Sequence, residues 1–429
     1  MGPPTRFALL AIALLASGSA HAGDTSDTLT GDWGGLRTDL RAKGIEFQFG
    51  YVSETAANLR GGTRHLTDYT DQWTFGTTLD LDRLLGLPHA RFQATITDRN
   101  GRNLSSDAGL NTLQQVQEVF GRGQTWRITQ LWYDQSFFDG AFDWKIGRLT
   151  VGEDFASAAC DFMNLTFCGA QPGNIVGDYW FNWPVSQWAT RGKLALSGFG
   201  YVQLGVYEVN PTYLENGDAF SLSAPGATGA LIPLELGWLP TVGEAKLPGS
   251  YKFGLWYDTS RADDVSDNDQ GQSLLVVGGQ PQRHRGRYGA YVAALQQVAR
   301  PSPTEPDRGL SVFIRASLAD RRTATLDSQI AVGMVYTGPF DARPRDEIGF
   351  AVGLTHVNDR VADAQRQQNA AGLGPVPVQQ SEYAAEIYYG LHAISGVVLR
   401  PNLQFIHDPG GVSQNEDVLV IGLKAVVNF

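Results

Sequence analysis

The sequence predicts an all-β fold, a transmembrane antiparallel β-barrel of sixteen strands, on three grounds. From residue 44 onward, segments of about ten residues alternate apolar and polar side chains, which is typical of membrane strands. Turn-rich stretches separate the segments, and the number of strand segments is even, as in bacterial single-chain barrels. The chain also has 50 glycines among 429 residues, 11% aromatic residues and only 18% charged residues, where soluble domains carry roughly 25% charge.

Residues 1–22 are predicted to be a signal peptide, so the mature chain is expected to begin near Gly23. Arg6 precedes an apolar run at 7–16 that is too short for the roughly 20 residues of a spanning helix, and a small-residue cleavage site ends at Ala22. A buried N-terminal helix is the less favoured alternative. No later stretch approaches the about 18 apolar residues of a helical span, which leaves a secreted protein or a barrel.

Residues 23–43 are predicted to form a periplasmic segment with one short helix. Trp33, Leu36 and Leu40 share one face of this helix, and Gly44 ends it. Packing against the periplasmic rim of the barrel is the simpler role, and gating is the alternative.

Residues 44–429 are predicted to form the barrel. The last segment shows the pattern well, because Ile421 and Leu423 lie on one face, Lys424 lies on the other, and the chain ends on the aromatic Phe429. The expected strands are 44–54, 70–81, 90–100, 125–137, 141–148, 187–198, 200–209, 231–239, 249–259, 287–298, 309–319, 326–337, 347–356, 382–391, 396–406 and 417–429.

The expected connections alternate, with long ones after odd-numbered strands and mostly short ones after even-numbered strands. An even barrel that starts from the periplasm places every long loop outside. Sixteen strands leave an aqueous channel, whereas eight would be filled by side chains. The long connections are 55–69, 101–124, 149–186, 210–230, 260–286 and 357–381, and 320–325 and 407–416 are shorter exceptions.

The third long connection, 149–186, is predicted to fold into the lumen. It is the longest, and a loop in water would expose Trp180 and Trp183 unfavourably. Packing on the barrel wall or on a neighbouring subunit is the alternative. Cys160 and Cys168 predict a local disulfide in an oxidising compartment. Two cysteines cannot make a structural zinc site alone, and no metal or other cofactor is expected.

Several segments of the mature chain resemble the carbohydrate-selective porin family of bacterial outer membranes, the OprB type. They are the Gly-Asp-Trp-Gly-Gly-Leu-Arg entry at 31–45, and 133–140, 145–148, 153–155 and 207–211. The resemblance covers essentially the whole mature chain. It implies passive, selective diffusion of glucose and related sugars through a narrow, charged pore, and homotrimers in at least some members.

A pore for sugars needs charged groups that bond hydroxyls and aromatic surfaces for the flat sugar faces, while binding stays weak enough for release. Strand parity places such side chains in the lumen, although the strand at 125–137 is ambiguous. The candidates for lining the pore or contacting the solute are Glu46, Arg91, Arg99, Trp132, Asp134, Glu153, Asp154, Trp180, Trp183, Arg191 and Lys193.

Parity also places further polar side chains on the lumen side: Glu235, Arg315, Glu382, Glu386, Arg400 and Gln404. For any single charge, lining water is the simpler alternative to contacting solute. A general or anion-selective porin is the alternative function, and it would have more arginines than carboxylates at the constriction. A secreted adhesin is a third hypothesis.

No enzyme is expected, because the mature sequence has no catalytic or nucleotide-binding motif and its histidines are scattered. The net charge of −11 argues against nucleic acid. Lipid and lipopolysaccharide are the expected surroundings, and the basic run at 283–287 could hold lipopolysaccharide phosphates. The acidic run at 263–269 could bind calcium, but it lacks the closing Glu of an EF-hand, so a solvated loop is favoured.

Overall fold

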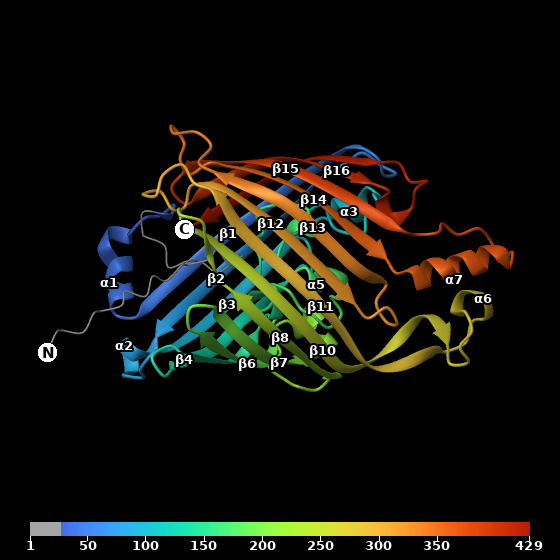
Figure 1. Ribbon diagram of the computed structural model, residues 1–429, viewed down its shortest axis with the longest axis horizontal. Helices are drawn as coiled ribbons and strands as arrows, with labels where there is room; N and C mark the ends of the chain where they lie inside the picture. The colour runs from blue at the N-terminus through green and yellow to red at the C-terminus, as the bar shows by residue number, and fades with distance from the viewer. Residues whose placement is uncertain (1–26) are drawn as a thin grey trace.

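The computed structural model describes residues 27–429, which form a closed antiparallel barrel (Figure 1). The predicted signal peptide lies outside the described residues. Strand β1 (Ile45–Arg60) pairs with β2 (Thr67–Asp80) on one side and with β17 (Val418–Asn428) on the other, so the first and last strands close the sheet. The predicted sixteen-stranded barrel is confirmed.

The remaining strands follow one another around the wall. Each pairs with its neighbours in chain order, except that β9 (Thr241–Val242) is a two-residue piece that pairs only with β10. They are β3 (Ala90–Gly101), β4 (Trp126–Phe137), β5 (Phe142–Leu149), β6 (Gln187–Leu196), β7 (Gly200–Val209), β8 (Gly229–Trp238), β10 (Leu247–Asn268), β11 (Pro281–Ala299), β12 (Gly309–Ala319), β13 (Leu326–Thr337), β14 (Glu347–Val357), β15 (Ser381–Ile394) and β16 (Val397–His407).

The helices are short and lie at the barrel ends or in its connections. Within the described part of the chain, no helix has the length and apolar character needed to cross a membrane. The α-helices are α1 (Leu36–Ala42), α2 (Leu81–Leu85), α3 (Leu104–Asp107), α4 (Val151–Asp154), α5 (Pro172–Ile175), α6 (Leu274–Val277) and α7 (Asp359–Ala370). The 3-10 helices are η2 (Trp33–Gly35), η3 (Leu165–Phe167), η4 (Pro211–Leu214), η5 (Asn216–Asp218) and η6 (Pro409–Gly411).

The predicted N-terminal helix is present as η2 and α1, at the same end of the barrel as the C-terminus, whereas α6 and α7 lie at the opposite end (Figure 1). We call these the terminus end and the loop end. The Trp33 ring stacks 6.1 Å from that of Phe49 on the outer wall, and Arg37 Nη2 donates to the backbone oxygen of Phe429 at 2.6 Å. The predicted apolar face is only partly buried, because Leu36 is 54% exposed.

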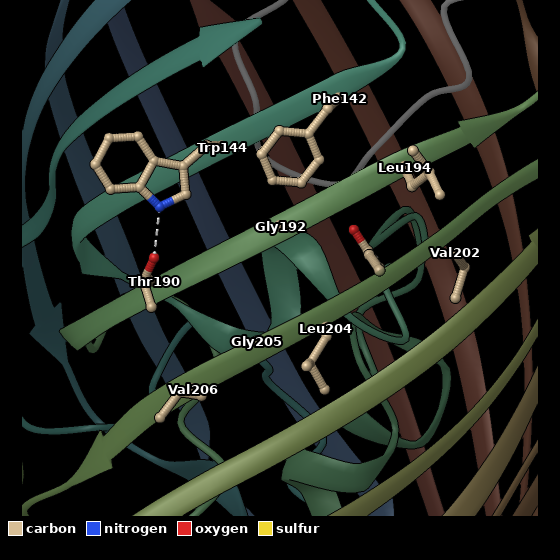
Figure 2. Close-up of a pocket in the computed structure, with 10 residues that line it drawn as sticks. Phe142, Trp144, Thr190, Gly192, Leu194, Val202, Leu204, Gly205 and Val206 are labelled. Atoms are coloured by element: carbon tan, nitrogen blue, oxygen red, sulfur yellow. Dashed lines mark hydrogen bonds between the residues drawn. The ribbon is translucent and has the colours of Figure 1, made fainter. Parts of the chain in front are cut away.

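The wall separates an apolar outer face from a polar inner face. On β10, Phe253, Leu255 and Tyr257 point outward and are 46%, 59% and 47% exposed, while Asp258 is buried inside. Figure 2 shows the outer face of β5 to β7, where Trp144 Nε1 donates to Thr190 Oγ1 at 2.8 Å in a shallow groove lined mainly by apolar side chains. The indole N–H of Trp144 is thus paired on the lipid-facing side, where an unpaired polar group is costly.

Strand β4 contains a bulge that explains why its parity is ambiguous in the sequence. The register with β3 shifts at Thr129, which leaves one extra residue on β4. Before the bulge Arg127 points inward and donates to the Tyr213 carbonyl at 3.0 Å; after it Trp132 and Asp134 point inward. Odd-numbered residues before the bulge and even-numbered residues after it therefore point into the lumen.

The predicted loop at 260–286 is wrong, because β10 and β11 continue into it as a long hairpin that reaches the loop end. The hairpin pairs the acidic run with the basic run, so that Asp263 lies 3.2 Å from Arg283 and Asp264 lies 2.8 Å from His284 Nε2. Opposite charges on facing residues stabilise an antiparallel pair. Arg287, the last residue of the basic run, does not pair with the acidic run. Its side chain is buried and bonds Asp258 at 2.7 Å.

Candidate functional site

Loop L3, which we define as residues 150–186, crosses the lumen. The Asn164 N–H donates to Glu386 on β15 at 2.8 Å, and the Ala156 N–H donates to Glu235 on β8 at 2.9 Å. These two strands belong to distant parts of the wall, so a loop that bonds both must pass through the interior. The structure therefore agrees with the inward-folded loop and not with a loop lying against a neighbouring subunit.

Loop L2, which we define as residues 102–125, also enters the lumen, and no pattern in the sequence predicted this. The Leu113 N–H donates to Glu382 at 2.6 Å, and the Val119 N–H donates to Glu54 at 3.1 Å. The two loops together narrow the channel.

The predicted disulfide between Cys160 and Cys168 is present within L3. It closes a short segment of the loop, because only seven residues separate the two cysteines in the sequence.

Trp180 is not a pore-lining residue, and this prediction is wrong. Its side chain is completely buried, with ring centroids 5.4 Å from Trp256 and 5.9 Å from Tyr291 on the wall. Edge-to-face packing against these wall rings removes the apolar surface of Trp180 from water and from any solute. Trp183, by contrast, is only partly buried and donates through Nε1 to Gln72 Oε1 at 2.9 Å.

Five charged side chains of strands β3 to β6 and of L3 form a network inside the barrel. Asp134 bonds Arg91 at 2.9 Å and lies 3.7 Å from Arg191 Nη2, which lies 3.7 Å from Asp154 as well. Lys145 Nζ lies 2.8 Å from Asp154. The Arg91 side chain is 57% exposed, so the network opens to water at this point. Strands β3 to β6 and the helix α4 of L3 thus bring together residues that are far apart in the sequence.

Aromatic rings lie beside this network. Lys145 Nζ is 4.8 Å from the centroid of the Trp132 ring, and Lys193 Nζ is 4.1 Å from that of Tyr201. Asp143 completes the group by bonding Arg191. Charged groups and ring faces are the two kinds of surface that a sugar needs.

Two acidic residues of L3 have opposite electrostatic character. Burial raises the pKa of Asp154, but the cations of Lys145 and Arg191 outweigh burial and hold the pKa below its ordinary value. Burial raises the pKa of Glu153, which accepts bonds from Gln130 at 2.8 and 3.0 Å. Asp154 therefore stays charged at neutral pH as part of the network, and Glu153 fastens α4 to β4.

The remaining candidates lie elsewhere. Arg99 is buried, donates to Gln72 at 2.8 Å and to the Gly121 carbonyl at 3.0 Å, and so holds L2. Glu46 lies near the terminus end of β1, 3.3 Å from Arg41 of α1. The prediction missed Asp143, Lys145 and Tyr201, although Asp143 and Lys145 alternate with apolar neighbours in the expected strand at 141–148. This alternation could have placed both in the lumen.

A sixteen-stranded barrel with an apolar outer face, a charged interior and two loops that narrow it is a porin, a channel of the bacterial outer membrane. The chain belongs to one family of this class. The model of the carbohydrate-selective porin, OprB family, matches residues 64–429. The protein is therefore a transport channel for sugar-selective diffusion across the outer membrane.

Known relatives are similar along nearly the whole chain. Porin B of Pseudomonas aeruginosa is 46% identical over 98% of this chain and 96% of its own. The putative porin QuiX of Acinetobacter baylyi is 35% identical over 99% of both chains. The high-pH structure of Pseudomonas putida OprB superposes with a TM-score of 0.91 and 46% identity, covering 95% of this chain and 99% of that one.

Proposed function

We propose that sugars cross this channel past Arg91, Lys145, Asp154 and Arg191 of the network, in which the buried Asp134 holds the two arginines. The observation that carries the proposal is the mixed-sign network beside the partly buried ring of Trp132 in a channel of the carbohydrate-selective family. Arginine can bond two neighbouring hydroxyls with its planar fork. Each bond replaces one to water, so the net gain is small and the solute can leave.

The balance of charge favours a neutral solute over an anion. An anion-selective site needs an excess of cations, whereas here four cations face four carboxylates that bond them or lie beside them. The cations are Arg91, Lys145, Arg191 and Lys193, and the carboxylates are Asp134, Asp143, Asp154 and Glu235.

The proposal also covers the export of the chain, its orientation in the outer membrane and its contact with lipid. Residues 1–22 direct export and are removed, the terminus end faces the periplasm, and the loop end faces outward. The apolar outer face supports contact with lipid. Assembly into a homotrimer is carried over from the family resemblance.

Planar bilayers test the proposed path with single-channel currents titrated by glucose, by maltose-type sugars and by phosphate. We expect millimolar sugar to reduce the current in a saturable way, and phosphate at the same concentration to leave it unchanged. A current that phosphate blocks and sugars do not would show an anion-selective pore instead.

A further inference from the structure

We propose that strands β15 to β17 carry a clamp that positions L2 and L3 relative to each other and thereby sets the size limit of the pore. The clamp consists of Glu382, Glu386, Gln404 and Lys424. It deepens the proposed function and rests on it, because it names the residues that fix the opening through which the sugars pass. All four side chains point into the barrel, yet each is at most 2% exposed. They therefore do not contact solute, although strand parity alone would place them on the pore surface.

The two glutamates hold backbone amides of the two loops. Glu386 accepts the N–H groups of Met163 and Asn164 in L3, both at 2.8 Å and one on each carboxylate oxygen. Glu382 accepts the N–H groups of Leu113 in L2 at 2.6 Å and of Gln114 at 3.3 Å. Bonds from amides to a carboxylate are stronger than bonds between neutral groups.

The other two residues each touch both loops. Lys424 Nζ donates to Glu118 of L2 at 2.8 Å and to the carbonyls of Cys160 and Phe162 of L3 at 3.0 and 3.1 Å. Gln404 donates to the Val116 carbonyl of L2 and accepts from Asn164 of L3, both at 3.0 Å. One strip of the wall thus fixes the position of one loop with respect to the other.

The loops need such partners because their backbone is irregular. A buried N–H or C=O group that has no helix or sheet partner must find another one. Further along the wall, Arg315 Nη1 on β12 donates to the Phe167 carbonyl at 2.8 Å and Lys252 on β10 donates to the Ser157 carbonyl at 2.6 Å. Wall cations therefore hold loop carbonyls and wall carboxylates hold loop amides.

Glycines at inward positions of the wall give L3 its space, independently of the charges. A Cβ at Gly353 would lie 2.6 Å from Thr166 Cγ2, and one at Gly422 would lie 2.4 Å from Met163 Cε. The wall is thus shaped for one position of L3. A loop seated by both shape and charge gives an opening of fixed size.

Polymer exclusion in planar bilayers tests the clamp without sugar. Wild type and Glu386→Gln are compared by the change in ion conductance on adding polyethylene glycols of graded size. Glutamine can accept only one of the two amides and points its NH₂ at the other, so the ratio of seated to unseated L3 should fall by roughly tenfold. We expect the exclusion limit to shift to larger polymers, and Glu386→Asp, which keeps the carboxylate, to return it towards wild type.

A matched control is Asp327→Asn. Asp327 is also a buried, inward-facing carboxylate, but it bonds Arg321 and His356 at the rim and neither of the two loops. This variant should keep the wild-type exclusion limit, which separates an effect on the loops from an effect of losing a buried charge.

The outcomes decide the clamp and the sugar path separately. Heat-modifiable migration in gels shows which variants have folded. If Glu386→Gln does not fold, the exclusion limit of Glu382→Gln, which releases L2, is the deciding measurement. An unchanged exclusion limit in the folded variants, or the same shift in the Asp327 control, overturns the clamp. A shifted limit in a channel whose wild type shows no block by sugar supports the clamp and refutes the proposed path.

Discussion

Replacing Arg191 with alanine should change both the ion selectivity of the channel and its affinity for sugar. Arg191 is bonded to Asp143 and lies 3.7 Å from both Asp134 and Asp154. Its removal leaves these three carboxylates with the nearby cations of Arg91, Lys145 and Lys193, so the local charge falls by one unit. The pKa of Asp154 should rise as a consequence, since Arg191 is one of the cations that hold it down.

The size of the effect follows from the bonds that are lost. Two unit charges about 4 Å apart interact by about 4 kcal/mol at an effective dielectric constant of about 20. A single bond between a sugar hydroxyl and a charged group contributes less, about 1.5–3 kcal/mol. We therefore expect sugar to bind at least about tenfold more weakly, which corresponds to about 1.4 kcal/mol, and potassium to become more permeant relative to chloride.

The assay combines the reversal potential in a potassium chloride gradient with a glucose titration of single-channel current. Arg191→Lys keeps the charge and should preserve selectivity, while losing part of the sugar block because lysine lacks the planar fork. Arg285→Ala removes an exposed arginine of the loop-end hairpin and should change neither measurement. Unchanged reversal potential and unchanged block in Arg191→Ala would show that Arg191 does not face the path.

Three further predictions concern the fold. Serine at Cys160 and Cys168 should lower stability by about 2 kcal/mol in thermal unfolding but keep the polymer exclusion limit, because the wall holds L3; a larger limit would contradict this. Burial raises the pKa of Asp346, but bonds from Arg343 and Tyr389 lower it to about 2, so this carboxylate stabilises the fold above pH 4 and the effect disappears as the pH falls to about 2. Asp346→Asn should therefore unfold at a lower temperature than wild type at pH 6 and at the same temperature near pH 2; an equal difference at both would refute this reasoning. Arg37→Ala should speed tryptic cleavage of α1 without changing conductance, and unaltered cleavage would show that the tether is unimportant.

The sequence determined the barrel because membrane strands repeat with a period of two. Phe253, Leu255 and Tyr257 alternate with polar neighbours, and this alternation is decided by lipid on one side and water on the other. The predicted strand faces and bounds were wrong where pairing with a neighbouring strand interrupted or extended this alternation. The bulge at Thr129 shifts the parity of β4, and the pairing of Asp263 with Arg283 turns an expected loop into a hairpin.

The lumen was decided by the tertiary structure. Parity places Arg191 and Glu386 alike on the inner face, but only the path of L3 shows that Arg191 belongs to the network beside the opening and Glu386 lies beneath the loop. Trp180 is buried for the same reason, since it meets wall rings from β10 and β11. The barrel, its strands and the two faces of its wall can therefore be predicted from the amino-acid sequence, because they depend on local alternation. The loops that narrow the lumen are held by bonds between residues that can be hundreds of positions apart in the sequence. The tertiary contacts of these loops therefore decide which charged side chains the solute can reach.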